Sequence, residues 1–130
     1  MRTELWFYSG PPRLFDRLIR LWTGSRFSHV ELVVDNIAYG ADAWEGKVRT
    51  KFVNTFNPEH WDVVPVALVK DRTWINAQVG KKYDWLGIFG FFMPFRVQDK
   101  RRWYCSEFCA ELTGVETRPI SPQKLFDAVR

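Results

Sequence analysis

The chain has 130 residues, of which 46% are hydrophobic and 26% charged, a balance typical of a globular protein and not of a disordered one. This length suits one domain, so we predict a single domain over residues 1–130. The formal net charge of +4 suits an anionic partner, but the longest basic run is Lys100–Arg102 and no nucleic-acid-binding motif accompanies it, so nucleic acid is not the expected partner.

The first ten residues, MRTELWFYSG, lack the basic segment, apolar run and cleavage site of a signal peptide. The most apolar stretch, 85–95, has 11 residues and is too short to span a bilayer. These features predict a cytoplasmic protein, and a bacterium or a phage would suit as its source.

The first half of the chain predicts a strand, a helix and a hairpin. The strand covers 4–9 and ends at the Gly-Pro-Pro of 10–12. Apolar residues at helical spacing predict a helix over 12–22. Residues 28–43 predict a β-hairpin with a two-residue turn at 35–36. That turn pairs Val34 with Ile37, which makes one face of the hairpin apolar throughout.

The other face of the predicted hairpin is more polar. In the same register Glu31 lies opposite Gly40, and His29 lies opposite Asp42. We therefore expect His29 to face a carboxylate across the two strands.

The second half predicts two more strands and several helices. Strands are expected over 47–53 and 61–69, and Asp71 is expected to cap a helix over 72–79. Further helices are predicted in 83–95, from Cys105 to a stop at Gly114, and over 122–129 after a proline in the first turn. The pattern is that of an α+β protein with an antiparallel sheet at its centre.

The two cysteines, Cys105 and Cys109, lie four residues apart on one predicted helix. This spacing suits few disulfides. Cys109 follows the apolar side of the helix with Phe108 and Leu112, so we predict a core residue. Cys105 lies where the helix begins, and free backbone amides there favour a negative charge. Cys105 is therefore the candidate nucleophile.

A thiol nucleophile needs a base, and the chain has only His29 and His60. A carboxylate bound to one imidazole nitrogen would turn the other towards a thiol, which makes His29 the better candidate. His60 lies in a predicted loop before a strand. Two cysteines with a Cys-x3-Cys spacing and one distant histidine match a zinc site poorly, so we predict neither a metal nor a cofactor.

Three stretches, RLIRLWTGSRFSHVELVV, KKYDWLG and WYCSEFCAEL, resemble successive motifs of the permuted NlpC/P60, papain-like family. The resembling branch is typified by the YiiX and YaeF proteins, with lecithin:retinol acyltransferase as a more distant relative. The resemblance extends over about residues 14–113. The histidine precedes the cysteine along the chain, which is the order of the permuted branch.

The resemblance implies a papain-like core, in which a helix that carries the nucleophile packs against an antiparallel sheet. Cys105 would be the nucleophile and His29 the general base. The family's third polar residue, often His or Glu, lies on the strand after the histidine strand, where this chain has neither at the expected place. Asp42 is the nearest candidate, with Glu31 and Glu45 as alternatives.

Two more residues lie in motifs of the resemblance. Tyr83 would border the cleft or contribute to the oxyanion hole, and a packing role in a helix is the alternative. Glu107 follows the nucleophile by two residues, and it would also suit the first turn of a helix as an acidic residue.

The predicted function is that of a cysteine-dependent hydrolase, an amidase or peptidase that works through an acyl-thioester. Its substrate would be a peptide or amide, for example of the cell wall. The first alternative is a lipid acyl hydrolase or acyltransferase, for which stretch 85–95 and the basic charge suit an anionic lipid surface. The second alternative is a non-catalytic binding module with a degenerate site.

Overall fold

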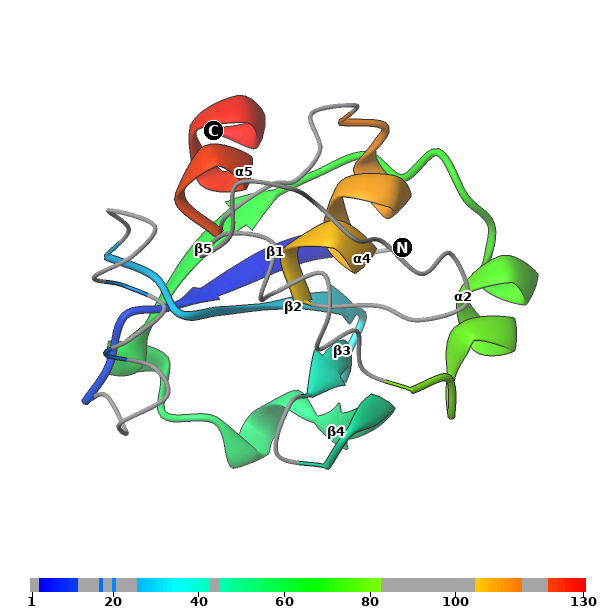
Figure 1. The fold of residues 1–130 in the computed structure, drawn as a ribbon, viewed down its shortest axis with the longest axis horizontal. Helices are drawn as coiled ribbons and strands as arrows, with labels where there is room; N and C mark the ends of the chain where they lie inside the picture. Colours follow the sequence, from blue (N-terminus) through cyan, green and yellow to red (C-terminus); the bar gives the residue numbers. More distant parts are fainter. Residues whose placement is uncertain are drawn as a thin grey trace, which may run out of the picture.

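The computed structural model describes residues 3–11, 17, 20, 26–42, 45–82, 105–115 and 122–130. Within these residues it shows an α+β protein with one five-stranded antiparallel sheet, in the order β4-β3-β2-β1-β5 (Figure 1). The strands are β1 (Thr3–Tyr8), β2 (His29–Val34), β3 (Ile37–Asp42), β4 (Lys47–Phe52) and β5 (Trp61–Pro65). The helices are α2 (Arg72–Gln78), α4 (Cys105–Thr113) and α5 (Pro122–Val129), and the 3-10 turns are η1 (Val53–Thr55) and η2 (Pro58–His60).

The hairpin of β2 and β3 has the predicted register. Val34 pairs with Ile37, and the next pairs towards the open end of the hairpin follow in step. Asp35 takes a left-handed φ of 55° in the turn, a conformation in which aspartate is several-fold enriched. The predicted division of the hairpin into two faces therefore holds, and it decides which side chains meet the helices.

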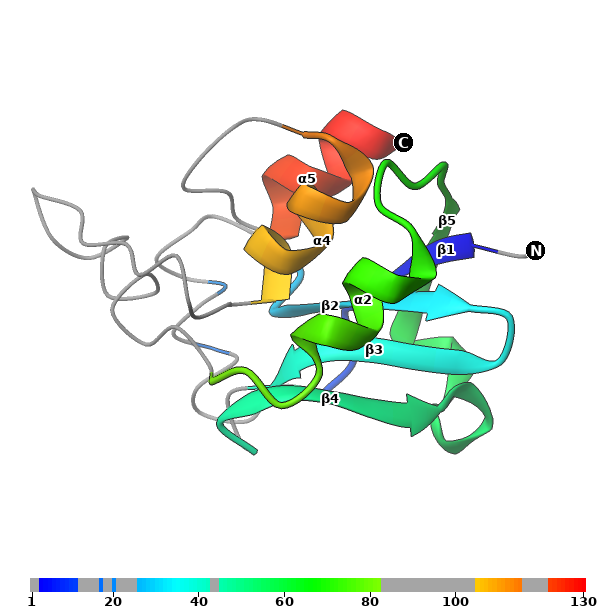
Figure 2. The same ribbon diagram turned by 90° about the vertical axis from the view of Figure 1, so that its right-hand side faces the viewer.

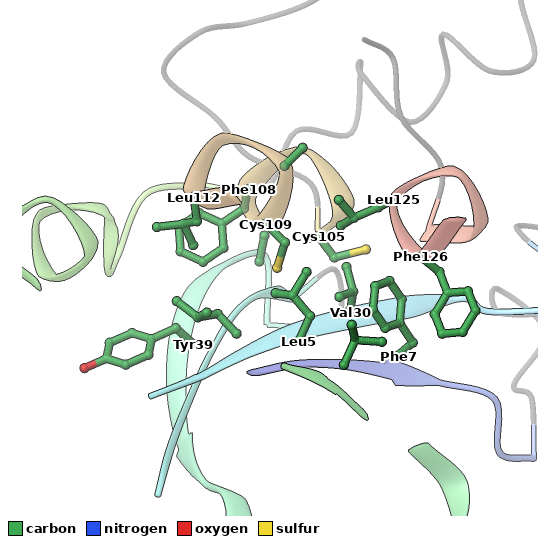
Figure 3. Packing of buried hydrophobic residues seen from close by; sticks show 14 of the residues in the cluster. Leu5, Phe7, Val30, Tyr39, Cys105, Phe108, Cys109, Leu112, Leu125 and Phe126 are labelled. Carbon is green, nitrogen blue, oxygen red and sulfur yellow. The ribbon is translucent and has the colours of Figure 1, made fainter. Parts of the chain in front are cut away.

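Helices α4 and α5 pack side by side on one face of the sheet (Figure 2). The face of α4 that carries Cys105 and Cys109 is turned towards the strands, above Leu5 and Val30 (Figure 3). From α5, Phe126 packs its ring against Phe7, with 5.1 Å between the ring centroids. Each fully buried apolar side chain of this core contributes about 1.5–3 kcal/mol to folding.

Helix α2 begins where its sequence predicts and ends at Gln78, one residue before the predicted end. The Asp71 side chain accepts a hydrogen bond from the Trp74 amide at 2.9 Å, which caps the helix. After the helix, the chain lies along the edge of β4, where the Gly80 amide donates to the Val48 carbonyl at 2.8 Å. The Val48 amide in turn donates to the Lys81 carbonyl at 2.8 Å, so this segment satisfies part of the backbone at the edge of β4.

The prediction of a strand over 61–69 is wrong in its second half, because β5 ends at Pro65. A proline has no amide hydrogen to donate to a neighbouring strand, so the ladder with β1 stops there. One more hydrogen bond, from the Val66 amide to the Thr3 carbonyl at 3.1 Å, follows before the chain leaves the sheet.

The sheet face turned away from α4 and α5 carries a smaller cluster of aromatic and aliphatic side chains. Its rings are those of Trp6, Phe56 and Trp61, and Phe56 stacks on Trp61 at 4.7 Å between centroids. His29 and Glu31 belong to this side of β2. The cluster therefore borders the polar residues on which the functional prediction depends.

The helix predicted over 12–22 lies outside the described residues except for Arg17 and Arg20, and the segment 83–95 lies wholly outside them. Among the helices of the described residues, none has both the length and the hydropathy needed to cross a membrane.

Candidate active site

The first residue of α4 is Cys105, and Cys109 follows one turn later. Both thiols are free and buried, with exposed fractions of 4% for Cys105 and 0% for Cys109. Cys109 lies within the apolar cluster between α4 and the sheet, as the sequence predicts. The helix ends at Gly114, whose φ of 77° is the left-handed conformation that glycine supplies at helix ends.

His29 opens β2 and lies between the thiol of Cys105 and the carboxylate of Glu31. On one side, Cys105 raises the pKa of the imidazole through a side-chain hydrogen bond and through its charge. On its other side, the imidazole Nε2 bonds to Oε2 of Glu31, two residues along the same strand. Because Nε2 is bound to Glu31, Nδ1 is the ring nitrogen left for the thiol.

The carboxylate that bonds to the imidazole of His29 is therefore that of Glu31. The cross-strand register had instead favoured Asp42 for this position. Residues two apart on a strand project from the same face, and a glutamate is long enough to reach its neighbour there. In the structure Asp42 bonds instead to Arg49, whose Nε donates to its Oδ2 at 3.0 Å. Asp42 is thus linked to the imidazole only through Arg49 and Glu31.

Gly40 provides the space in which the Glu31 carboxylate lies. A Cβ atom built on Gly40 would be 1.8 Å from Oε2 of Glu31 and 2.5 Å from its Cδ. Real Cβ atoms essentially never come that close to another heavy atom. The absence of a side chain at Gly40 is thus a geometric condition for the contact between Glu31 and His29.

Arg49 of β4 gathers the three carboxylates that the sequence offered as the third site residue. Its Nη1 donates to Oε1 of Glu31, its Nη2 lies 3.0 Å from Oδ2 of Asp42, and its Nε lies 3.2 Å from Oε2 of Glu45. The Glu31 side chain is wholly buried and that of Arg49 is 8% exposed, so their ion pair is shielded from water. Lys51 adds a second cation, 3.9 Å from Asp42.

The setting of His29 favours its protonated form. Burial alone would lower the pKa of the imidazole, but the Glu31 carboxylate, together with the hydrogen bond and charge of Cys105, raises the pKa to about 10. At neutral pH the proton therefore resides on His29. The imidazolium then donates from Nε2 to Glu31, which leaves its Nδ1 N–H for the thiol of Cys105.

Glu31 is the counter-ion that stabilises the protonated form of His29. Burial alone would raise the pKa of its carboxyl group, but His29 and then Arg49 hold the pKa below its usual value. In the same way, Glu31 and Asp42 outweigh the effect of burial on Arg49 and raise the pKa of its guanidinium. All three groups are ionised near neutral pH, as an alternating row of positive, negative and positive charge.

Cys109 has the opposite setting. Its burial, and then the negative charges of Cys105 and Glu31, raise the pKa of the Cys109 thiol well above its ordinary value. The protonated thiol is a poor nucleophile. The two cysteines of α4 thus have different neighbours: Cys105 interacts with the positively charged imidazole of His29, whereas Cys109 is affected by negative charges.

His60, the alternative base, lies in η2 with its ring edge-on to Tyr8, at 6.2 Å between centroids. The ring of Trp61, in the same cluster, lies 6.4 Å from the imidazole of His29 between centroids. Of the two supporting candidates, Tyr83 lies outside the described residues. Glu107 is part of α4, but its side chain lies outside the described part of the chain.

The position of Arg49 in this site could have been predicted from the sequence by considering the strand after the hairpin. In the structure β3 and β4 pair in a register that sets Gly40 opposite Arg49 and Asp42 opposite Lys47. Extending the predicted register by one strand would have placed Arg49 on the face of His29 and Glu31.

Within the described residues, no group of three or more His, Cys, Asp or Glu side chains is arranged to hold a metal ion. The site consists instead of a thiol, an imidazole, a carboxylate and a guanidinium in line. Comparisons with models of known protein families and with curated proteins found no match to this chain.

Proposed function

We propose that the protein is a cysteine-dependent acyl-transfer enzyme, most simply a hydrolase of amide or peptide bonds. The observation that carries the proposal is the line of contacts from Glu31 through His29 to Cys105. A thiol at a helix start that bonds to an imidazole, which is held in turn by a buried carboxylate, is the arrangement of nucleophile, base and orienting acid.

The raised pKa of His29 changes how the thiol would be activated. From the sequence, His29 was expected to remove the proton when the substrate arrives. With a pKa of about 10, the imidazole already carries a proton at neutral pH. The imidazolium would then stabilise a thiolate on Cys105 before the substrate binds.

In the proposed reaction the Cys105 sulfur attacks the carbonyl carbon and forms a tetrahedral oxyanion, which backbone amides at the start of α4 would stabilise. The carbon–nitrogen bond then breaks, and the leaving amine takes the proton from Nδ1 of His29. A thioester remains on Cys105. Water gives a proton to His29 and attacks the thioester, which releases the acid and restores the thiolate and imidazolium.

Glu31 fills the role that the sequence left open. The alternative of a non-catalytic binding module rested on the lack of a family-type third residue on the strand after His29. A buried carboxylate on Nε2 supplies the same orientation from the same strand, so that argument loses its force. For the alternative of a lipid acyl hydrolase, the supporting stretch 85–95 lies outside the described residues.

The geometry also supports the permuted papain-like fold as part of this proposal. A helix that begins with the candidate nucleophile packs on β2, the strand that carries the candidate base. The base precedes the nucleophile along the chain, as in the permuted branch. Both features agree with the resemblance read from the motifs.

An acyl-enzyme should therefore form on Cys105 when the protein meets an activated acyl probe. Intact-mass and peptide-mass measurements should find one acyl group on Cys105 in the wild type and in Cys109→Ala, and none in Cys105→Ala. His29→Ala should slow acylation by about 10²–10⁴-fold, the usual contribution of a general acid–base. Acylation of Cys105→Ala at the wild-type rate would overturn the proposal. If Cys105 is the acylated residue, a panel of amide, peptide and lipid ester substrates identifies the acyl group.

A further inference from the structure

We infer that Arg49 is a positioning residue, which holds the Glu31 carboxylate against the imidazole while Asp42 anchors Arg49 from the other side. The inference rests on the proposed function, because positioning matters to reactivity only if Cys105 and His29 work together. It adds Arg49 and Asp42, on two other strands, to a site that otherwise consists of α4 and β2.

The Glu31 carboxylate is held at both of its oxygens. Glu31 has two carboxylate oxygens, and each has its own partner: Oε2 bonds to His29 and Oε1 bonds to Arg49. A carboxylate bound at both oxygens cannot rotate about its last bond without losing one of them. The orientation of the oxygen on the imidazole is therefore set by the guanidinium.

Arg49 is itself held in place by Asp42. Its Nε and Nη2 both lie 3.0 Å from Oδ2 of Asp42, while Nη1 reaches Glu31. The planar guanidinium thus spans the carboxylates of Glu31 and Asp42 from two strands, and its Nε also lies 3.2 Å from Oε2 of Glu45. A lysine ammonium is a single point charge on a flexible stem and lacks this fork. The site requires the shape of arginine as well as its charge.

The ion pairs of Arg49 with Glu31 and Asp42 are buried. Glu31 and Asp42 are both buried, and the Arg49 side chain is 8% exposed. Ion pairs in such surroundings are screened little by water or salt, so their geometry is maintained. Lys51, which also approaches Asp42 but is 44% exposed and 3.9 Å away, offers a matched cation without this role.

Two other roles for Arg49 would give different results. As a nearby positive charge alone, Arg49 disfavours protonation of His29, so its removal would raise the pKa of the imidazole. As a positioning residue, its removal frees Glu31 from the imidazole and lowers that pKa. A purely structural residue would change stability but would not act through Glu31.

The test is a double-mutant cycle of Glu31→Gln and Arg49→Gln, read by the alkylation rate of Cys105 and by NMR titration of His29. The chain has two histidines, so a His60→Gln variant assigns both imidazole signals. We expect Arg49→Gln to slow alkylation about tenfold and to lower the pKa of His29. In the Glu31→Gln background the same change should alter the rate less than about twofold, since the two residues then act as one unit.

Arg49→Lys keeps the charge and serves if Arg49→Gln does not fold; it should also slow alkylation about tenfold. Lys51→Gln should keep the wild-type rate. A wild-type rate in Arg49→Lys, an additive effect in the cycle, or a raised pKa of His29 in Arg49→Gln would overturn the inference. If alkylation in the wild type does not depend on His29, the proposed function fails, and the His29 titration still decides whether Arg49 holds Glu31 in place.

Discussion

The free energy of unfolding should fall by about 5 kcal/mol between pH 6.5 and about pH 10 through His29 alone. The pKa of this imidazole is raised from 6.5 to about 10 on folding, and each tenfold gain in proton affinity corresponds to about 1.4 kcal/mol. Because the folded state holds the proton more tightly, the contribution is complete below pH 6.5 and is lost as the pH rises through 10.

Denaturant unfolding at a series of pH values measures this decline. The His29→Gln variant should lack it, and His60→Gln should retain it, since His60 contacts Tyr8 and not the charged row. Glu31 sets the acid side: its lowered pKa gives a contribution that is present above pH 4.5 and lost as the pH falls below that value. Parallel curves for wild type and His29→Gln above pH 6.5 would contradict the raised pKa of His29.

Gly40→Ala should be among the most damaging single substitutions in the sheet, although it adds only one methyl group. The new Cβ would lie 1.8 Å from Oε2 of Glu31, so the carboxylate must shift. Because each of its oxygens is already bound, we expect this shift to break its contacts with His29 and Arg49. Breaking a buried ion pair in this way costs about 3–5 kcal/mol. Without the clash, alanine in a strand would instead stabilise the fold by about 0.5–1 kcal/mol.

Thermal or denaturant unfolding of Gly40→Ala gives the sign of the effect directly. Gly46→Ala is the control: no atom lies within 4 Å of its added Cβ, and its φ of 73° alone should cost about 1–2 kcal/mol. The Gly40→Ala variant should also lose the fast alkylation of Cys105, which Gly46→Ala should keep. A Gly40→Ala protein as stable as the wild type would show that Glu31 does not need this space.

Local signals in the sequence were sufficient for much of the fold. The turn at 35–36 fixed the register of the first hairpin, because a slip of one residue would have exposed its apolar face. The Asp71 cap and the stop at Gly114 likewise depend on neighbours within a few residues. By contrast, β1 lies between β2 and β5, and no local pattern encodes that arrangement.

Local patterns also explain why the sequence favoured Asp42, and not Glu31, as the third site residue. Cross-strand register compares backbone positions, and it correctly placed His29, Glu31 and Asp42 on one side of the hairpin. It does not include side-chain length or the partner on the next strand. Glu31 reaches the imidazole along its own strand, while Arg49 from β4 engages Asp42, and this outcome depends on a third strand.

The rate of iodoacetamide alkylation at about pH 6 shows whether His29, held by Glu31, activates the thiol of Cys105. An ordinary thiol with a pKa of about 8.5 is less than about 1% ionised there. Peptide mass spectrometry should find Cys105 alkylated about 100-fold faster than Cys109 and should find this advantage lost in His29→Ala. Equal, slow alkylation of both cysteines, or a His29→Ala rate equal to that of the wild type, would show that His29 does not activate Cys105.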